Sequence, residues 1–333
     1  MGGANLAQMN RKVRVRWGRV LGALFFLGIF VIGLLTVYQY IEKTVNTLNQ
    51  PFKKVEEKHF VQGKESPPFE KTQNKTDEVN VLILGSDSRG EKQARTDTIM
   101  VGHYDLKAHK VKLISLMRDM YVSIPQHGQQ KLNAAYSYGG PELLRQTLKE
   151  NFGLDIQYYA IVDFKGFEKA VDVLVPNGIE VDVPHKMSKG IGMTLDKGKQ
   201  TLHGKELLGY VRFRQDRLSD FGRVQRQQEV ISKLKEEAIS LNSVTKLPKL
   251  LEISKAYVDT NIETSTLLTI GKDMLTNNAG KIETLRIPEN GSFENKRYQD
   301  VGEVLEVDLE QNKKAVETFL GETDVAQKEE KNE

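Results

Sequence analysis

The segment Val20–Tyr40 constrains the fold of this chain more than any other feature, because 21 consecutive positions carry no charged side chain. About 20 apolar residues are enough for a helix to span the hydrocarbon core of a bilayer. Residues 1–19 contain five basic residues and no acidic one, whereas only the mixed pair Glu42–Lys43 follows the segment. This asymmetry predicts an N-terminus in the cytoplasm and a chain that continues outside the membrane.

A cleaved signal peptide is the alternative interpretation of the same segment. The apolar run is long for the core of a signal peptide, and no small-x-small cleavage site follows it. The sequence therefore favours an anchor. We expect a basic cytoplasmic tail over residues 1–19 and a transmembrane helix over residues 20–41, which together make a single-pass protein of the cell membrane with an extracellular body.

The charge distribution argues against a nucleic-acid partner. The formal net charge is +3, and the five basic residues of the N-terminal tail exceed it, so the rest of the chain carries −2. A basic site further along must therefore come from local clustering. The chain has no cysteine, so neither disulfides nor thiol chemistry are available, and a hydrophobic core has to stabilise the body. This composition fits exported proteins of Gram-positive bacteria.

Beyond the anchor, the composition divides the chain into a linker, a body and a tail. Residues 42–78 are polar and contain Pro51 and the pair Pro67–Pro68, which is typical of an extracytoplasmic stalk. Apolar periodicity begins at Val79 and predicts one folded domain over residues 79–321. Residues 322–333 are charged and are expected to be disordered.

The pattern within the body predicts an α/β domain with a mixed central sheet and helices on both of its faces, a three-layer α/β/α arrangement. Pro141 is expected to open a helix that Gly153 closes, and Asp163 to cap the next helix. Apolar runs predict strands at residues 79–85, 98–106, 110–117 (a hairpin with the preceding run), 158–164, 178–183 (an edge or arm) and, as the last strand, 281–287. Helical periodicity predicts further helices at residues 205–213, 222–241, 245–255 and 264–277.

The first block of residues that could form a binding site follows the apolar strand that ends at Leu84. Asp87 and Asp97 flank a loop that also holds Arg89 and Arg95. Divalent cations such as Mg²⁺ are bound by one or two carboxylates together with substrate phosphates. The alternative is that the two aspartates cap turns and pair with the neighbouring arginines. The block is not a P-loop, because it lacks the ending Gly-Lys-Ser/Thr.

The second block is Arg118, which follows the apolar strand KLISLM. A lone Arg-Asp pair is usually a surface ion pair, but a position beyond a strand end favours a place in a site. The segment Lys131–Gly140 could bring Asn133 into this site, or it could form a turn before the Pro141 helix.

The third block is the most specific, because five arginines occur between Arg212 and Arg226 with no lysine among them. Arginine is planar and forked, which suits phosphate oxygens. Ser219–Asp220 is expected to cap the long helix, whose N-terminus would favour anions. Arg223 and Gln227 are four residues apart and so share one helical face. Arg212 and Arg214 share a face only if their segment is extended.

Together these blocks resemble the LytR–CpsA–Psr family of bacterial cell-wall proteins, and the teichoic acid transferases within it in particular. The resemblance covers roughly Val79 to Leu241. The matching segments occur in the family's order and are LILGSDSRG, RTDTIMV, ISLMRDMYVSIP, KLNAAYSYGG, LHGKELLGYVRFR and DFGRVQRQQ.

The resemblance implies an enzyme that transfers a phosphoglycopolymer, such as wall teichoic acid, from a polyprenyl-pyrophosphate carrier to peptidoglycan through a phosphodiester. It implies that Asp87 and Asp97 hold Mg²⁺, with Mn²⁺ as the alternative ion, and that one of them acts as general base. Arg118 would belong to the catalytic centre. The residues that would bind the pyrophosphate are Arg89, Arg95, Arg118, Arg212, Arg214, Arg223 and Gln227. Arg217 and Arg226 match less well. The lipid would lie in an apolar channel, and the protein would be an anchored monomer.

Two other functions are compatible with the same arginines. A non-catalytic regulator would bind polyprenyl pyrophosphates and transfer nothing. A pyrophosphatase would use water in place of the sugar hydroxyl. The sequence does not identify which glycopolymer is transferred.

Overall fold

A computed structural model describes residues 78–86, 96–240, 243–276 and 281–321 of the 333-residue chain. The predicted cytoplasmic tail, transmembrane helix and stalk, and the tail over residues 322–333, lie outside these ranges apart from Glu78. Within the described ranges, no helix combines the length and the apolar character that a membrane crossing needs. Among the described residues, the first strand begins at Glu78 and the last helix ends at Leu320.

The centre of the body is a six-stranded mixed sheet. Its strands, in spatial order, are β10 (Glu283–Ile287), β3 (Lys110–Leu116), β2 (Thr98–Asp105), β1 (Glu78–Ser86), β6 (Tyr158–Asp163) and β9 (Val258–Thr260). β1 pairs antiparallel with β2 and parallel with β6, and β10 pairs parallel with β3. The predicted hairpin is present, since β2 and β3 pair antiparallel with Ile99 opposite Leu116. The prediction of a mixed sheet is confirmed.

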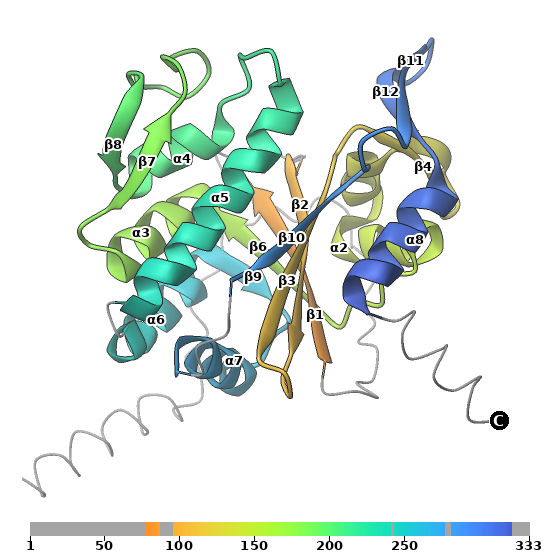
Figure 1. The fold of residues 1–333 in the computed structure, drawn as a ribbon. Coiled ribbons are helices and arrows are strands. Elements are labelled where there is room, and N and C mark those ends of the chain that lie inside the picture. Colours follow the sequence, from red (N-terminus) through yellow and green to blue (C-terminus); the bar gives the residue numbers. More distant parts are fainter. Residues whose placement is uncertain (1–77, 87–95, 241–242, 277–280, 322–333) are drawn as a thin grey trace, which may run out of the picture. The chain divides into compact units, whose positions relative to one another are not determined.

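Helices cover both faces of this sheet (Figure 1). On one face lie α2 (Leu132–Phe152) and α8 (Leu309–Leu320), and on the other lie α3 (Phe164–Leu174), α5 (Ser219–Ser240) and α6 (Leu247–Tyr257), with α7 (Thr264–Thr276) near one end of the sheet. Residues opposite each other in register point to the same face. Leu82, Val101 and Ile114 are therefore neighbours, and they are fully buried in the core that also includes Leu144 and Phe152 of α2.

The face toward α5 carries polar anchors as well as apolar residues. Gln228 donates from Nε2 to Ser115 Oγ on β3 (3.1 Å) and to the carbonyl oxygen of Leu285 on β10 (3.2 Å). The preceding residue, Gln227, donates from Nε2 to Thr98 Oγ1 at the start of β2 (3.0 Å). These hydrogen bonds fix the position of α5 along the sheet, and so place its N-terminal turns at the end of β2.

We expect Phe152→Ala to lower the free energy of unfolding by about 3–5 kcal/mol, because it removes a fully buried ring and leaves a cavity. Chemical denaturation followed by circular dichroism measures the loss. Leu218→Ala is the control, since Leu218 is 51% exposed and should change stability by less than about 0.5 kcal/mol. Equal effects of the two substitutions would contradict this description of the core.

A second hydrophobic cluster lies beside the sheet. It contains residues of α3, of the hairpin β7 (Ile179–Val183) and β8 (Gly198–Leu202), and of α4 (Gly204–Arg212), together with Val230 of α5. In the described chain β7 pairs only with β8, as the predicted arm does. The segment between these strands is anchored by the buried side chains of Met187, Ile191 and Leu195.

A separate four-stranded sheet was not predicted. Its order is β11 (Phe293–Tyr298), β12 (Gly302–Val307), β4 (Met120–Ile124) and β5 (Gly128–Lys131). The prediction that residues 281–287 form the last strand is therefore wrong, because β11, β12 and α8 follow it. β11 exposes four of its six residues, so it lacks the apolar signal by which a buried strand is recognised in a sequence.

α2 begins at Leu132 but consists of two helical stretches, separated at Gly139 and Gly140, where φ is −145° and 65°. The second stretch starts at Pro141, as predicted, whereas the first was not predicted. The segment Lys131–Gly140 is thus mostly helical and is not a turn. The predicted ends of the neighbouring elements are confirmed: Gly153 closes α2 in the left-handed region (φ 73°), and Asp163 Oδ1 accepts a hydrogen bond from Lys165 N (2.8 Å).

Candidate functional site

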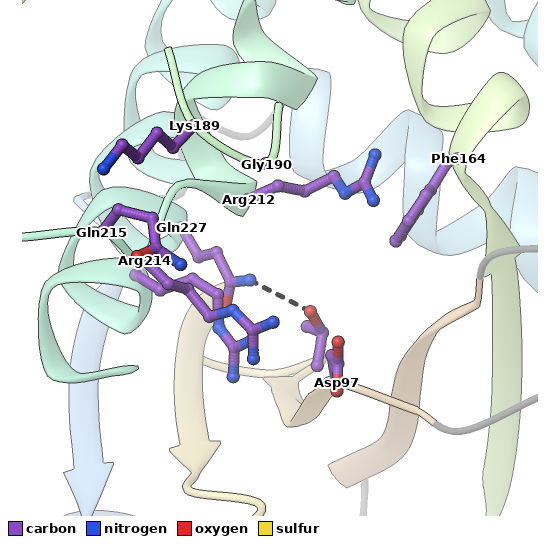
Figure 2. Close-up of a pocket in the computed structure, with 10 residues that line it drawn as sticks. Asp97, Phe164, Lys189, Gly190, Arg212, Arg214, Gln215 and Gln227 are labelled. Atoms are coloured by element: carbon purple, nitrogen blue, oxygen red, sulfur yellow. Dashed lines mark hydrogen bonds between the residues drawn. The ribbon is translucent and has the colours of Figure 1, made fainter. Parts of the chain in front are cut away.

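A pocket opens where the start of β2, the end of α4 and the first turns of α5 meet (Figure 2). Four cationic side chains and one carboxylate line it, so the lining has a formal charge of +3. Such a site attracts anions. The lining residues are Asp97, Thr98, Phe164, Lys189, Gly190, Arg212, Arg214, Gln215, Arg223 and Gln227.

The end of α4 places two arginines in the pocket. Arg212 is the last residue of the helix, and Phe213 follows in an extended conformation (φ −61°, ψ 135°). Because the helix stops between them, Arg212 and Arg214 both reach the lining although they are only two residues apart. The guanidinium carbon of Arg212 lies 4.5 Å from the centre of the Phe164 ring, an arrangement that Figure 2 shows from the side.

Arg226 holds this segment in place and does not line the pocket. Its guanidinium donates to the carbonyl oxygens of Tyr210 (3.1 Å) and Phe213, and to Asp216 Oδ2 (2.8 Å). Asp216 in turn accepts through Oδ1 from the backbone of Leu218 and Ser219. The weaker match of Arg226 to the family's binding residues therefore has a structural explanation. Arg217 is exposed and is not part of the lining.

α5 contributes Arg223 and Gln227 from one face, as their spacing predicts. The Arg223 side chain is only 5% exposed, and its Nε–H is buried without a hydrogen-bond partner among the described residues. Burial lowers the pKa of Arg223 from its ordinary value, against the raising effect of Asp220, and Arg118 and Arg214 lower it further. A buried guanidinium with an unused donor is suited to binding an anion.

Asp220 is the carboxylate around which the arginines are arranged. Its Oδ2 accepts from Arg118 Nε (3.1 Å) and from Arg223 Nη2 (3.2 Å), and its Oδ1 lies 3.8 Å from Arg214 Nη1. The sequence predicted only a helix cap for this residue. An acidic residue at the start of an arginine-rich helix was the available signal, but its three partners come from three separate segments.

Arg118 links this cluster to Asp97. Arg118 Nη1 donates to Asp97 Oδ1, and Arg118 Nε also lies 3.3 Å from Asp119 Oδ2. Burial alone would lower the pKa of Arg118, but Asp97, Asp220 and Asp119 outweigh it and raise the pKa above its ordinary value. Arg118 does not line the pocket itself, but it contacts Asp97, whose carboxylate does line it.

Of the predicted site residues, Asp87, Arg89 and Arg95 lie outside the described residues. The structure brings together Asp97, Arg118, Arg212, Arg214, Arg223 and Gln227. Lys189, Phe164 and Gln215 were missed, since they stand on loops or element ends without a chemical pattern. In the described ranges, no group of three or more His, Cys, Asp or Glu side chains is placed to hold a metal ion. Asp97, 42% exposed at the pocket, supplies one carboxylate, which fits a magnesium ion whose other ligands include substrate phosphates.

The fold and the site define a mixed α/β protein with an arginine-lined, positively charged pocket at one end of its sheet. The chain belongs to the LytR_cpsA_psr family, whose model matches residues 35–317. The resemblance found in the sequence blocks is therefore confirmed.

Two relatives and one solved structure illustrate the similarity. The regulatory protein MsrR of Staphylococcus aureus (strain COL) is 45% identical over 244 residues, covering 73% of this chain and 75% of MsrR. The polyisoprenyl-teichoic acid–peptidoglycan teichoic acid transferase TagU of Oceanobacillus iheyensis is 33% identical over 297 residues, covering 84% and 88%. The structure of the LytR-CPS2A-psr family protein YwtF (TagT) of Bacillus subtilis with bound octaprenyl pyrophosphate lipid matches with a TM-score of 0.54 at 26% identity, covering 78% and 97%.

Proposed function

We propose that this chain transfers a phosphate-linked glycopolymer, with wall teichoic acid as the leading candidate, from a polyprenyl-pyrophosphate carrier to peptidoglycan. The observation that carries the proposal is the pocket of charge +3, in which Arg223 is buried with an unused donor. TagU, a relative over 84% of this chain, is a teichoic acid transferase by name, and TagT binds a polyprenyl pyrophosphate.

In the proposed reaction, a peptidoglycan hydroxyl oxygen attacks the phosphorus on the polymer side of the pyrophosphate. The bond from this phosphorus to the bridging oxygen breaks, a phosphodiester forms, and polyprenyl monophosphate leaves with the electron pair. The hydroxyl proton passes to a carboxylate, for which Asp97 and Asp87 are the candidates. The donor carries its own activated pyrophosphate, so the reaction needs no ATP outside the cell.

Phosphoryl transfer depends mainly on positioning and on neutralisation of charge. Arg212, Arg214, Arg223 and Gln227 are assigned to the pyrophosphate oxygens, with Arg89 and Arg95 as further candidates. Arg118 keeps Asp97 oriented and adds positive charge beside it. Mg²⁺ held by Asp97 and Asp87 would neutralise charge on the same oxygens when bound. We further propose that residues 20–41 anchor the chain, so that the body acts outside the membrane on a carrier embedded in it.

The test uses the full chain purified in detergent with a synthetic polyprenyl-pyrophosphate glycan, peptidoglycan oligomers and Mg²⁺. We expect mass spectrometry to detect a phosphodiester-linked product that EDTA abolishes and added Mg²⁺ restores. Asp97→Asn should reduce product formation by about two orders of magnitude, in the range of a lost general base, whereas Arg217→Ala should retain it. Undiminished transfer in EDTA would contradict the metal assignment.

The two alternative functions give different products in the same assay. A pyrophosphatase would release free phosphorylated glycan even when acceptor is abundant. A regulator would bind the carrier lipid and leave it intact. This alternative is tested because the relative MsrR is named a regulatory protein. Either result would overturn the transferase proposal.

A further inference from the structure

The outer face of the four-stranded sheet carries two stacked tyrosines that do not line the pocket. Tyr121 stands on β4 and Tyr298 ends β11, with β12 between these strands. Their ring centroids are 4.8 Å apart and the ring planes are 23° from parallel. Both side chains are partly exposed. We call this pair the tyrosine platform.

The sheet holds the platform rigidly. Its inner face is buried, with Met120, Val122 and Leu305 in the main core. Tyr121 lies opposite Glu306 of β12 in register, so both point outward. Glu306 Oε2 accepts from Tyr298 Oη (2.7 Å) and from Lys296 Nζ (2.9 Å). Hydrogen bonds from Lys296 and Tyr298 lower the pKa of Glu306, which keeps it an ionised acceptor beside the rings.

The platform is connected to the pocket through a short chain of ion pairs. Tyr121 follows Arg118 by three residues, so their Cα atoms are at most about 10 Å apart. Lys131, opposite Tyr121 in register, contacts Asp119 Oδ1 (3.0 Å), and Asp119 contacts Arg118. Tyr121 is therefore three residues from the arginine that contacts Asp97 at the pocket.

The tyrosine platform and the pocket differ in charge, so they favour different ligands. Around the platform, Lys131 and Lys296 pair with three carboxylates, Asp119, Glu294 and Glu306, so these ion pairs carry no excess of positive charge. A polyanionic donor would prefer the pocket of charge +3. A sugar ring offers an apolar C–H face edged by hydroxyl and amide groups. Tyrosine provides a large, rigid apolar surface with a polar tip at low entropic cost, and the charged groups at the rim suit the sugar's polar edge.

We propose that the tyrosine platform binds the acceptor, an N-acetylated amino-sugar segment of a peptidoglycan glycan strand, and presents its hydroxyl to the pocket. The identity of the acceptor rests on the proposed function. The binding itself does not, because it can be measured without turnover.

The test titrates the full chain with a peptidoglycan tetrasaccharide and, separately, with octaprenyl pyrophosphate, by isothermal titration calorimetry. We expect Tyr298→Ala to weaken tetrasaccharide binding about tenfold, equivalent to about 1.4 kcal/mol, with binding of octaprenyl pyrophosphate unchanged. Tyr298→Phe keeps the ring and should stay within about twofold of the wild type. Tyr138→Ala is a matched control, since Tyr138 is also exposed and stacked, on His127, and should bind normally.

In the transfer assay, Tyr298→Ala should raise the KM for the glycan acceptor about tenfold while kcat is retained. Unchanged tetrasaccharide affinity in Tyr298→Ala, or a Tyr298→Phe variant as weak as Tyr298→Ala, would overturn the stacking proposal. A chain that binds the tetrasaccharide through Tyr298 but transfers no polymer would overturn the proposed function and leave the platform as a glycan-binding site.

Discussion

Replacing Arg223 with alanine is expected to weaken binding of octaprenyl pyrophosphate about 100-fold, or about 2.7 kcal/mol, which is within the range of a charge-assisted hydrogen bond to a buried anion. The side chain is 5% exposed and its Nε–H has no hydrogen-bond partner in the described part of the protein. In the proposed complex, a pyrophosphate oxygen would accept a hydrogen bond from this donor. Isothermal titration calorimetry on the full chain measures the change.

The fold should survive this substitution, because Asp220 keeps Arg118 and Arg214 as partners. Arg223→Lys preserves the charge but not the fork, so it should recover only part of the affinity and bind about tenfold more weakly than the wild type. The exposed Arg217→Ala should bind within about twofold of the wild type. If a folded Arg223→Ala protein binds the lipid as tightly as the wild type, Arg223 is not a binding residue.

Replacing Asp220 with asparagine is expected to lower the free energy of unfolding by about 3 kcal/mol, the low end for breaking a buried ion pair, since Asp220 is still 15% exposed. The substitution keeps the shape of the side chain but removes the charge shared by Arg118, Arg214 and Arg223. Thermal unfolding monitored by circular dichroism gives the loss, and Asp300→Asn at an exposed turn should be neutral.

The same variant should respond more strongly than the wild type to added inorganic pyrophosphate. An anion in the pocket supplies the negative charge that Asp220 no longer provides, and binding to the folded state raises its stability. We expect pyrophosphate to recover most of the lost melting temperature in Asp220→Asn and to raise that of the wild type less. An equal shift in the two proteins would mean that Asp220 does not organise the anion site.

Five of the six strands of the central sheet could be predicted from the sequence because they contain apolar runs, whereas β9, with three half-buried residues, was not predicted. Leu82, Val101 and Ile114 belong to continuous hydrophobic runs, and such runs identify buried strands. β11 could not be predicted in this way, because its charged residues face solvent and its pairing with β12 supplies the order. The helical segment before Pro141 was also hidden, since Gly139–Gly140 and the proline suggested a turn.

The arginines of the site were predictable from their clustering, and Arg223 and Gln227 share a face because of simple helical spacing. Their organisation was not predictable. Asp220 gains three arginine partners only when the segment after β3, the end of α4 and the start of α5 meet. Lys189 reaches the pocket from the segment between β7 and β8, where no periodicity marks its role. Local sequence patterns therefore identified the arginine donors. The role of Asp220 in positioning them depends on tertiary packing and could not be read from the sequence.

The passage of the chain from one sheet to the next has a mechanical consequence. Just after β3, Met117 N donates to the carbonyl oxygen of Ile287 (2.9 Å), and only two residues further on, the carbonyl oxygen of Asp119 accepts from Leu305 N (2.9 Å). Arg118 is thus held between two sheets that are both tied to its immediate neighbours. The pocket and the tyrosine platform cannot slide past each other without breaking these bonds. The segment therefore keeps the distance between the pocket and the tyrosine platform constant. In the proposed reaction, the pyrophosphate of the donor and the acceptor glycan would be held at the same distance whatever the length of the polymer. The rest of a longer polymer would extend into solvent.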